Sequence, residues 1–401
     1  MTSPAVPTTA GMLDGVRVAD FGRYVAGPWC AQLLQGLGAE VVRIERPSGG
    51  EDRSVFPIGT EAVGAYFVHC NRGKRAMTLQ PTKPAGREVV DRIVRWADVV
   101  IANVPDESLT AMGLDWPTVH AANPRAVLAT VTAFGTTGPY AGRLGFDAVG
   151  QVMSGATHLA GRPGDPIKSF VPYVDYGTAG LLAFATVAAL FQRERTGLGA
   201  RVEGSLLGTA LSVSAHTLIE QAVAGTDREA TGNRHPAAGP SDIVATLDGR
   251  LVVQVVGDAM FGRWCQLVGR PDLVDDARFA DDLARGQHGA ELSDVLSQWC
   301  ATRSTDEALA ELAAAAIPAG PLFTPQQALD DPHIRATMLT TADVPGFEGP
   351  SPALVYPLSS SGSPIDLGRR VPRVGEHTDE VLGELGYTGD EIADLRTALI
   401  V

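Results

Sequence analysis

A single acidic side chain, Asp175, stands in an otherwise apolar stretch that reads SFVPYVDYGTAG over residues 169–180. No Lys or Arg lies within five residues of it on either side, and Lys168 lies just beyond. An acid in this position commonly begins a helix, where it interacts favourably with the helix dipole. The alternative is a carboxylate nucleophile, because burial among the preceding apolar residues raises the energy of the ionised form.

The residues that follow Asp175 suit an acyl-transfer reaction. Residues 177–180 are small, so a bulky acyl donor would approach closely, and their backbone N–H groups would be available to a developing oxyanion. A thioester carbonyl is a suitable target because its sulfur leaves as a relatively stable thiolate. Asp175 is therefore the first candidate catalytic residue.

Five cations and no acid occur between residues 62 and 87, in a chain whose formal net charge is −14. One interpretation is a phosphate clamp in which Arg72, Lys74 and Arg75 meet a polyanion. The other is a solvated surface loop. Arg46, at the end of a predicted strand, would add positive charge to such a clamp.

Several common sites have no counterpart in the sequence. The first predicted strand is followed by GRYVAGP instead of the G-x-G-x-x-G of dinucleotide-binding proteins, and no G-x-x-x-x-G-K-[ST] phosphate loop occurs. The eight histidines show no metal-binding spacing, and no G-x-S-x-G nucleophile elbow is present. The sequence therefore disfavours nicotinamide, ATP, metal and serine-hydrolase sites.

Strands and helices alternate through the first part of the chain, which indicates a doubly wound α/β domain. The β-branched strands are typical of a parallel sheet covered on both faces. Ligands bind such sheets at the carboxyl ends of the strands, here near Gly22–Pro28, Arg46–Gly49 and Asn103–Pro105. The predicted strands are 16–21, 39–45, 97–103 and 126–134, and the predicted helices are 29–38, 83–96 and 106–112.

A long apolar helix is predicted to follow Asp175, over 179–194, and a strand and a second long helix come next. The turn-rich segment 225–240 then marks a domain boundary. Beyond it, the dipeptide Asp248-Gly249 predicts a β-hairpin, and three amphipathic helices follow. The segment 225–329 therefore reads as a smaller α+β domain.

The bulk composition limits the partners of this protein. A net charge of −14 at pI 5.0 argues against nucleic acid and anionic membranes, because both need a broad cationic face. The longest apolar run has about a dozen residues, too few to span a bilayer. Four widely spaced cysteines and an N-terminus without signal-peptide features predict a reducing, cytoplasmic location.

Several segments together resemble the family III CoA-transferases, which include carnitine CoA-transferase, formyl-CoA transferase and the α-methylacyl-CoA racemases. Each segment is modest by itself, but their order and spacing match the family from about Gly15 to Val401. The matching segments include GVRVADFGRYVAGPWCAQLLQGLGAEVVRIERP, YFVHCNRGKRAMTL, ADVVIANV, GFDAVGQVMSG, VDYGTAGLLAFATVAALFQRERTGLGARVEGSLL, GNRHPAAGP, DPHIRATM and GEHTDEVLGELGY.

The resemblance implies an interlocked homodimer of two ring-like subunits. Each subunit would have a large, Rossmann-like CoA-binding domain built from both chain ends, with the small domain between them. The expected boundaries are 12–224 for the first part of the large domain with its long linker helix, 225–329 for the small domain and 330–401 for the return segment.

The resemblance also assigns roles to individual residues. Asp175 corresponds to the family's nucleophilic aspartate, and Arg72, Lys74 and Arg75 in the N-x-x-K-R segment are our candidates for the 3′-phosphate or pyrophosphate of CoA. A loop at Val256-Gly257-Asp258 is the nearest counterpart of the family's glycine-bearing loop that closes the site. The positions expected to contact CoA are Val25, Ala26, Arg46, Leu79, Asn103 and Val104.

The implied reaction moves CoA from an acyl-CoA to a carboxylic acid through covalent steps on Asp175, first a mixed anhydride and then an aspartyl-CoA thioester. The bound thiolate acts at high effective concentration, of order 10⁵ M or more. Acyl-CoA and an acceptor acid are thus the expected substrates, and no tightly bound cofactor is expected.

Two departures from the family pattern narrow the choice among the reactions that its subgroups catalyse. The racemases carry a His-Asp pair in the G-x-D motif, whereas this chain has Phe146-Asp147, and Phe146 cannot exchange a proton. The formyl-CoA and oxalate subgroup has a Gln where this chain has Val25.

Three alternatives to a CoA-transferase stay open. They are a racemase or other isomerase that uses Asp175 with an unrecognised base, a non-catalytic CoA-binding protein and a nicotinamide dehydrogenase. The sequence does not identify the acyl group that is transferred. Either Asp147 or His235 would be able to assist in substrate binding.

Overall fold

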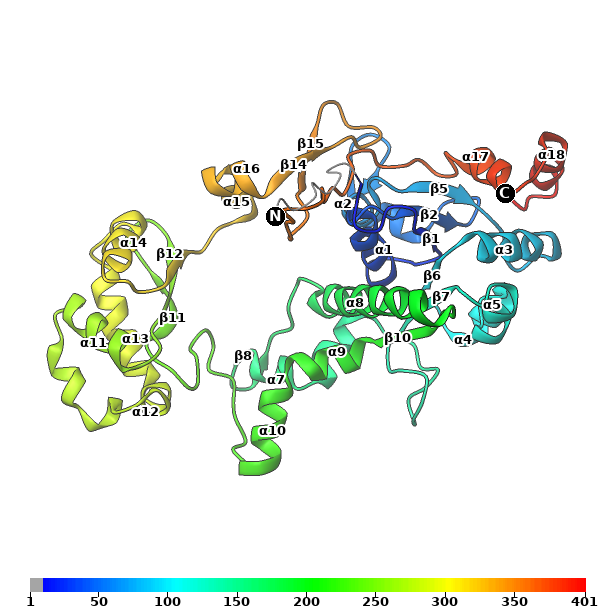
Figure 1. Cartoon of the computed structure of the whole chain (residues 1–401). Helices are drawn as coiled ribbons and strands as arrows, with labels where there is room; N and C mark the ends of the chain where they lie inside the picture. The colour runs from blue at the N-terminus through cyan, green and yellow to red at the C-terminus, as the bar shows by residue number, and fades with distance from the viewer. Residues whose placement is uncertain (1–9) are drawn as a thin grey trace, which may run out of the picture. The chain divides into compact units, whose positions relative to one another are not determined.

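The computed structural model describes residues 10–401, which form two compact units (Figure 1). The large unit consists of residues up to Ser154, Ser169–Thr217 and His333–Val401, so the chain leaves it twice and returns. The second unit consists of Gly155–Lys168 and Leu218–Pro332. The sequence-based boundaries did not assign 155–168 to the second unit, because this short hairpin segment carries no composition change.

The large unit contains a six-stranded parallel sheet in the order β10-β7-β6-β1-β2-β5. The chain winds outward from β1 through β2 to β5, then returns to the other side of β1 and winds through β6 and β7 to β10. This is the doubly wound order, as the alternating pattern predicted. The strands are β1 (Arg17–Asp20), β2 (Glu40–Glu45), β5 (Arg75–Thr78), β6 (Val99–Ala102), β7 (Val127–Thr132) and β10 (Arg201–Ser205).

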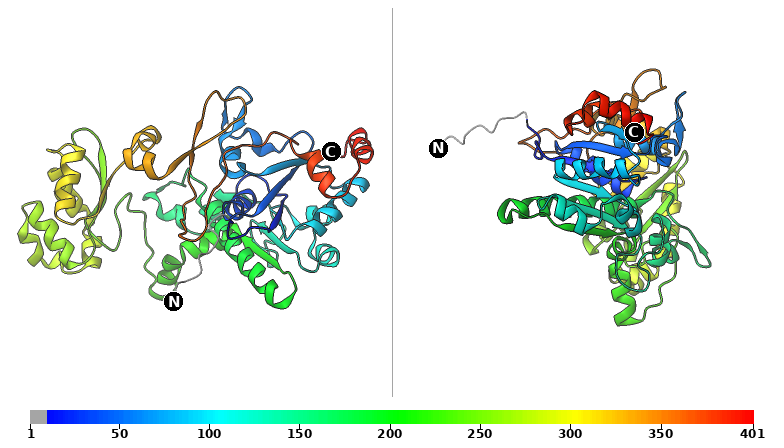
Figure 2. Two further views of the ribbon diagram at one scale, coloured as in Figure 1. Left: turned by 45° about the horizontal axis from the view of Figure 1, so that its top comes forward. Right: turned by 90° about the vertical axis from the view of Figure 1, so that its right-hand side faces the viewer.

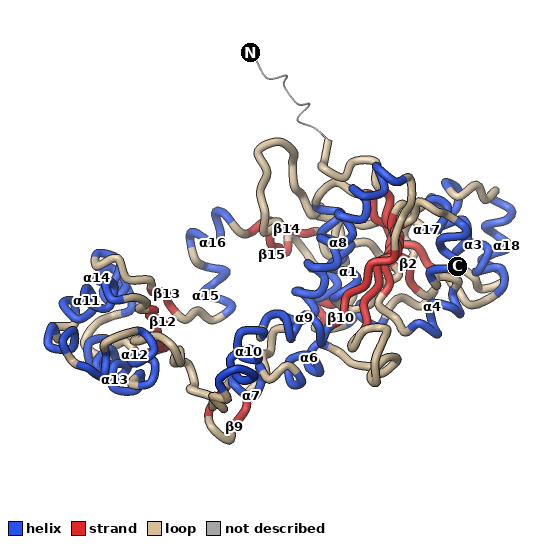
Figure 3. Tube along the Cα trace, turned by 60° about the horizontal axis from the view of Figure 1, so that its bottom comes forward, coloured by secondary structure: helices blue, strands red, loops and turns tan. Residues whose placement is uncertain are grey.

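Both faces of this sheet are covered by helices, as the tube in Figure 3 shows. In β6, Val99 and Ile101 face one core while Val100 and Ala102 face the other, because alternate strand residues point to opposite faces. All four are fully buried, which explains the uninterrupted apolar run. The first core contains α1 (Ala26–Gly36) and α8 (Tyr173–Thr196), and the second contains α3 (Pro84–Trp96), α5 (Trp116–Ala122), α17 (Thr378–Glu384) and α18 (Gly389–Thr397).

Helix α8 has 24 residues and is long and apolar enough by composition to cross a bilayer. The predicted start at 179 was too late, since the helix begins at Tyr173. One side of α8 packs into the first core, where Val174, Ala179 and Leu182 are buried. Its opposite side exposes an apolar stripe at Leu181, Phe184, Ala188 and Phe191.

The last segment of the chain returns to the edge strand β5, where Figure 2 shows α17 beside it. The N–H of Thr78 donates to Oγ1 of Thr378 at 3.1 Å, and the N–H of His377 donates to the Ala76 carbonyl at 2.8 Å. The hairpin of β14 (Leu339–Ala342) and β15 (Ser351–Leu354) lies in the same large unit and packs near α2 (Ala65–Asn71).

The remaining elements complete the large unit or join the two units in sequence. Those of the large unit are the 3-10 helix η1 (Glu51–Ser54), β3 (Pro57–Ile58), β4 (Val63–Gly64), α4 (Asp106–Met112), α6 (Asp147–Met153) and α9 (Leu206–Val213). Helices α10 (Ala215–Ala224) and α16 (Pro332–Thr337) span the boundaries, and the break at Ser214 divides the predicted second long helix into α9 and α10.

The second unit has an antiparallel sheet of β11 (Ser241–Ala245), β12 (Arg250–Gln254) and β13 (Ala319–Pro321). The predicted hairpin at Asp248-Gly249 is confirmed, since Ala245 pairs with Arg250 across the turn. Helices pack on this sheet around the buried Trp264. The other elements are α7 (Ala156–Leu159), β8 (Gly161–Arg162), β9 (Asp165–Pro166), α11 (Asp258–Leu267), η2 (Pro271–Asp275), η3 (Ala277–Phe279), α12 (Asp282–Gln287), α13 (Gly289–Cys300), α14 (Thr305–Ala314) and α15 (Pro325–Asp330).

Candidate active site

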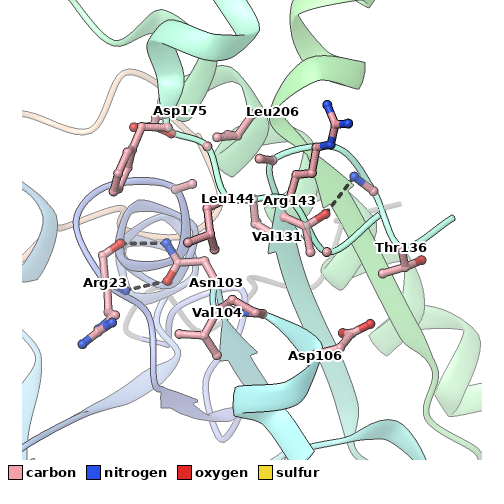
Figure 4. A pocket seen from close by; sticks show the side chains of 18 of the residues that line it. Arg23, Asn103, Val104, Asp106, Val131, Thr136, Arg143, Leu144, Asp175 and Leu206 are labelled. Atoms are coloured by element: carbon pink, nitrogen blue, oxygen red, sulfur yellow. Dashed lines mark hydrogen bonds between the residues drawn. The ribbon is translucent and has the colours of Figure 1, made fainter. Parts of the chain in front are cut away.

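A cavity of about 350 Å³ opens at the carboxyl ends of β1, β6 and β7 (Figure 4). Strand order reverses between β1 and β6, so this is the topological switch point at which doubly wound sheets bind ligands. Three loops form the walls, at residues 23–26, 103–106 and 131–146, and the side chains of Asp175 and Leu206 complete the lining. All of these residues belong to the large unit.

Asn103 ties the first two loops together. Its Oδ1 accepts the N–H of Arg23 at 2.6 Å, and its Nδ2 donates to the Arg23 carbonyl at 2.7 Å, the reciprocal pair drawn in Figure 4. This pairing fixes the loop that carries Val25 and Ala26 against the loop that carries Val104. The structure thus brings Val25, Ala26, Asn103 and Val104 to one cavity, and their contact with CoA stays a prediction.

The third loop, 133–146, extends beyond the end of β7 and forms a separate wall of the cavity. Gly135 and Gly142 adopt left-handed conformations, with φ of +87° and +78°, that other residues rarely take. Apart from the glycine itself and its two chain neighbours, no described residue has an atom within 4 Å of where a Cβ on either glycine would be. The backbone conformation, rather than crowding, therefore requires glycine at these turns.

Asp175 lies in the first turn of α8 and lines the cavity. Its side chain is partly buried, and burial followed by the charge of Asp147 raises its pKa to about 7. A carboxyl group with this pKa is ionised and protonated in comparable amounts near neutral pH, which is common for catalytic carboxylates. Asp175 therefore presents an incompletely solvated carboxylate to whatever occupies the cavity.

Two side chains of α6 hold the segment that carries Asp175. Oδ2 of Asp147 accepts the N–H groups of Val174 at 2.8 Å and of Asp175 at 3.0 Å. Nε2 of Gln151 donates to Oδ1 of Asp147, and its Oε1 accepts the N–H of Ser169 at 2.9 Å. Asp147 thus supplies from α6 the cap that the residue before α8, a proline, does not provide. The sequence singled out Asp147 but missed Gln151, four residues along the same helix face.

The prediction that the N–H groups of residues 177–180 are available to an oxyanion is wrong, because α8 already begins at Tyr173. These residues lie inside the helix, so their N–H groups donate to carbonyl groups one turn earlier. The N–H groups of Val174 and Asp175 are engaged by Asp147. None of these backbone groups is available to an oxyanion.

An aromatic cluster borders Asp175 on the side of α2. The ring of His69 stacks on Trp29 at 4.3 Å and meets the edge of Tyr176 at 5.7 Å. Burial, with the nearby charge of Arg72, lowers the pKa of His69 to about 4, so the imidazole is neutral at physiological pH. Burial likewise raises the pKa of Tyr176 far above its ordinary value. This border of the site is therefore uncharged.

In this structure Lys74 and Arg75 pair with acidic side chains and do not form the predicted phosphate clamp. The ammonium of Lys74 is buried and uses its three N–H groups on Asp20 at 2.8 Å, the Pro28 carbonyl at 2.8 Å and Oδ1 of Asn71 at 3.0 Å. Arg75 forms ion pairs with three glutamates, Glu40, Glu380 and Glu384. Both cations neutralise acids that lie far away in the sequence.

Arg72, Arg46 and Leu79 also lie away from this cavity. Arg72 is buried near β15. Arg46 pairs with Glu51 at 3.0 Å and lines a separate surface hollow, and Leu79 is 1% exposed in the second core. For Arg46 and Leu79, contact with CoA stays a prediction that would require backbone groups or movement.

Two cations that the sequence did not single out do line the cavity, Arg23 and Arg143. Arg23 pairs with Glu51 at 3.1 Å. The guanidinium of Arg143 lies 4.3 Å from the ring centre of Tyr140 and forms no ion pair with another of residues 10–401. Phe146 also lines the cavity, with its ring against the edge of Tyr24 at 5.8 Å. The signal that would have found Arg143 is its place in the loop after β7, at the same edge as the other two loops.

Two predicted residues lie in the second unit. The N–H of Gly257 donates to the carboxylate of Asp282 at 2.9 Å, so the Val256-Gly257-Asp258 loop is anchored within that unit. Nδ1 of His235 accepts the N–H of Ala237 at 3.1 Å, which makes it part of a local turn. Their roles in closing the site and binding substrate stay predictions.

Known proteins of one family match nearly the whole chain. The sequence profile of CoA-transferase family III matches residues 13–378. The succinate–glutarate CoA-transferase of Agrobacterium fabrum is 34% identical over 389 residues, which cover 95% of this chain and 97% of that protein. The succinyl-CoA–D-citramalate CoA-transferase of Chloroflexus aurantiacus is 32% identical, with 97% and 98% covered.

A solved structure agrees with these sequence matches. The crystal structure of a CAIB/BAIF family protein from Brucella suis is similar with a TM-score of 0.82 at 35% identity, over 94% of this chain and 100% of that one. The similarity therefore includes both units of the chain and not only its parallel sheet.

Proposed function

The chain belongs to CoA-transferase family III, and from that premise we propose that it transfers CoA from an acyl-CoA thioester to a carboxylic acid through covalent intermediates on Asp175. The observation that carries the proposal is the position of Asp175, whose carboxylate faces the switch-point cavity with a pKa raised to about 7. Burial makes such a carboxylate a better nucleophile than one in water.

The reaction begins when a carboxylate oxygen of Asp175 attacks the thioester carbonyl carbon. The carbon–sulfur bond breaks, CoA leaves as a thiolate, and a mixed anhydride joins the acyl group to Asp175. The thiolate then attacks the aspartyl carbonyl, which releases the donor acid and leaves an aspartyl-CoA thioester. The thiolate stays bound next to the anhydride, so the second step has the advantage of proximity.

The acceptor reverses these steps. Its carboxylate attacks the aspartyl-CoA carbonyl, thiolate leaves, and a second mixed anhydride forms. The thiolate attacks the acyl carbon of the acceptor, which gives the new acyl-CoA and returns Asp175 as a carboxylate. No net proton is gained or lost, so the absence of a proton-transferring side chain at Phe146 is compatible with this cycle.

The chain's own residues support each step. Asp147 and Gln151 hold the first turn of α8 in place, so that Asp175 meets the cavity in one orientation. The guanidinium of Arg143 provides positive charge at the cavity for the phosphates of CoA, whereas that of Arg23 is paired with Glu51. Succinyl-CoA is our proposed donor class, because the relatives from Agrobacterium fabrum and Chloroflexus aurantiacus carry succinate or succinyl-CoA in their names.

Trapping of the covalent intermediate tests this proposal. The protein is incubated with succinyl-CoA and treated with hydroxylamine or borohydride, and peptides are analysed by mass spectrometry. We expect a hydroxamate or an alcohol at Asp175, and neither product in Asp175→Asn. Transfer activity that persists in a folded Asp175→Asn protein would contradict the mechanism.

The racemase alternative is not favoured, because the relatives are named as CoA-transferases and Phe146 replaces a proton-exchanging residue. Incubation of an α-methylacyl-CoA in deuterated water separates the two reactions. A CoA-transferase incorporates no α-deuterium without an acceptor acid, whereas a racemase does.

We also propose a homodimer, interlocked as the family resemblance implies, in a reducing cytoplasm. Leu181, Phe184 and Phe191 on the outer side of α8 are 54%, 75% and 61% exposed, and a second copy of the chain would cover this apolar stripe. All four cysteines are free and buried. Light scattering should give twice the chain mass for the wild type and a smaller mass for Phe184→Glu.

A further inference from the structure

The guanidinium of Arg72 is buried in the large unit without an anion beside it. The residue is 1% exposed, and its Nη2 donates to the carbonyl oxygen of Leu354. Its Nε and Nη1 have no hydrogen-bond partner among residues 10–401. The charge of Asp366 acts on Arg72, but the two side chains are not within ion-pair distance. A guanidinium stays protonated, and a buried charge that lacks a partner is unfavourable.

A cavity of about 210 Å³ lies next to this guanidinium. Its walls are mainly hydrocarbon, from Ile58, Ala65 and Val68 on one side and from residues 351–354 of β15 on the other. His69 also lines the cavity but is neutral, so Arg72 is the positive charge of the lining. An apolar space with a single charged fork suits a small molecule that has a short hydrocarbon chain and a carboxylate.

Helix α2 carries residues that line this cavity and residues that lie near the segment of Asp175. Tyr66 lies in the first turn of α2, and burial, followed by the charges of Asp147 and Asp175, raises its pKa. Arg72 directly follows the same helix, about 9 Å along the axis at a rise of roughly 1.5 Å per residue. Between them, His69 lines the cavity and contacts Tyr176, the residue after Asp175.

We propose that Arg72 binds the second carboxylate of a dicarboxylic acid whose first carboxylate reacts at Asp175. This rests on the proposed CoA transfer and specifies the class of acid. A chain of four or five carbons occupies the hydrocarbon part of the cavity, and the unpartnered Nη1 of Arg72 donates to the distal carboxylate. The sequence had assigned Arg72 to a phosphate of CoA; the mainly hydrocarbon walls of the cavity suit a short carbon chain better than that partner.

A matched pair of acceptors tests the assignment. Glutarate and pentanoate have the same carbon chain, and only glutarate has a second carboxylate. The wild type should use glutarate with a kcat/KM about 100-fold higher than that for pentanoate, the factor expected for a hydrogen-bonded charged group. Arg72→Met should remove this preference by losing activity on glutarate alone, while Arg335→Met on the exposed α16 should keep it.

Arg72→Lys provides a second variant in case Arg72→Met does not fold. It keeps the charge but loses the fork, so it should recover part of the preference for glutarate. Equal losses on both acids in Arg72→Met or Arg72→Lys would show that Arg72 only supports the fold and would overturn the assignment. An unchanged preference in either folded variant would do the same.

A binding measurement separates this proposal from the proposed function. Glutarate should raise the melting temperature of the wild type more than pentanoate does, and this difference should vanish in Arg72→Met. If no acid accepts CoA, the proposed function fails, yet a shift by glutarate that depends on Arg72 still supports the carboxylate site. If CoA is transferred but glutarate and pentanoate behave alike in both assays, the assignment of Arg72 fails alone.

Discussion

The carboxylate of Asp147 accepts the backbone N–H of Asp175 at 3.0 Å, while its negative charge raises the pKa of the Asp175 side chain. Asp147 therefore both positions the backbone of Asp175 and disfavours the ionised form of its side chain. The hydrogen bond requires an oxygen at position 147, whereas the effect on the pKa requires a charge. These two contributions are separable by substitution.

Asp147→Asn should move the pH dependence of adduct formation to lower pH. The amide oxygen still accepts the N–H of Asp175, but the charge that disfavours its ionisation is gone, so the pKa of Asp175 falls from about 7. The rate of acyl-enzyme formation, followed by rapid quench between pH 5 and 9, gives the midpoint. Asp147→Ala, which loses the oxygen as well, should lower the rate itself by about 10- to 100-fold. A midpoint identical to that of the wild type in Asp147→Asn would refute the electrostatic role.

Asp175→Asn should stabilise the fold above pH 7 and leave it unchanged near pH 4. The pKa of Asp175 is about 7 in the folded protein and close to 3.8 when unfolded, so the folded state loses stability as pH rises between these values. The substitution removes this loss, which is about 1–3 kcal/mol after allowance for partial exposure. Urea unfolding at several pH values measures it, and a gain that does not depend on pH would be inconsistent with this origin.

Lys74→Met should destabilise the large unit without weakening the binding of acyl-CoA. Loss of the ammonium leaves the buried carboxylate of Asp20 unpaired, which costs about 3–5 kcal/mol. The double variant Lys74→Met/Asp20→Leu should recover part of this stability. Measurements of the free energy of unfolding and of KM distinguish this role from the phosphate clamp, which would raise KM and leave stability intact.

Arg143→Met should raise the KM for acyl-CoA about 10-fold with a small effect on kcat, because its free guanidinium meets an anionic substrate at the cavity. The KM of the wild type should also increase with salt more than that of the variant. Arg95→Met, an exposed arginine on α3 paired with Asp91, is the control and should leave KM unchanged. An effect confined to kcat would argue against a role in binding.

Much of the parallel sheet is predictable because the local sequence of most strands indicates a strand. The central strands β6 and β7 are short runs rich in β-branched residues, and the Asp248-Gly249 hairpin has a strong local signal. Edge strand β5 was missed, since its sequence RAMT follows a cluster of cations and has no alternating pattern. Its register comes from pairing with β2, as in Val42 opposite Arg75, which no local pattern contains.

The site was predictable where topology decides and unpredictable where distant partners decide. The ends of β1 and β6 pointed to the segments Gly22–Pro28 and Asn103–Pro105, and the family resemblance then named Val25 and Asn103 within them. The start of α8 was placed too late because Gly177 and Gly180 are poor helix formers, while its actual cap, Asp147, lies 28 residues before Asp175. Lys74 and Arg75 looked like free cations because Asp20 and Glu380, the acids that pair with them, are distant in the sequence.

The loop 133–146 lies outside the hydrogen-bonded sheet, yet it forms one side of the cavity that Asp175 lines. Substitutions and insertions there would reshape the cavity and leave the strands, Asp175 and its cap, Asp147, untouched. Natural evolution or protein engineering would therefore change the choice of substrate most readily by changing the sequence or length of this loop.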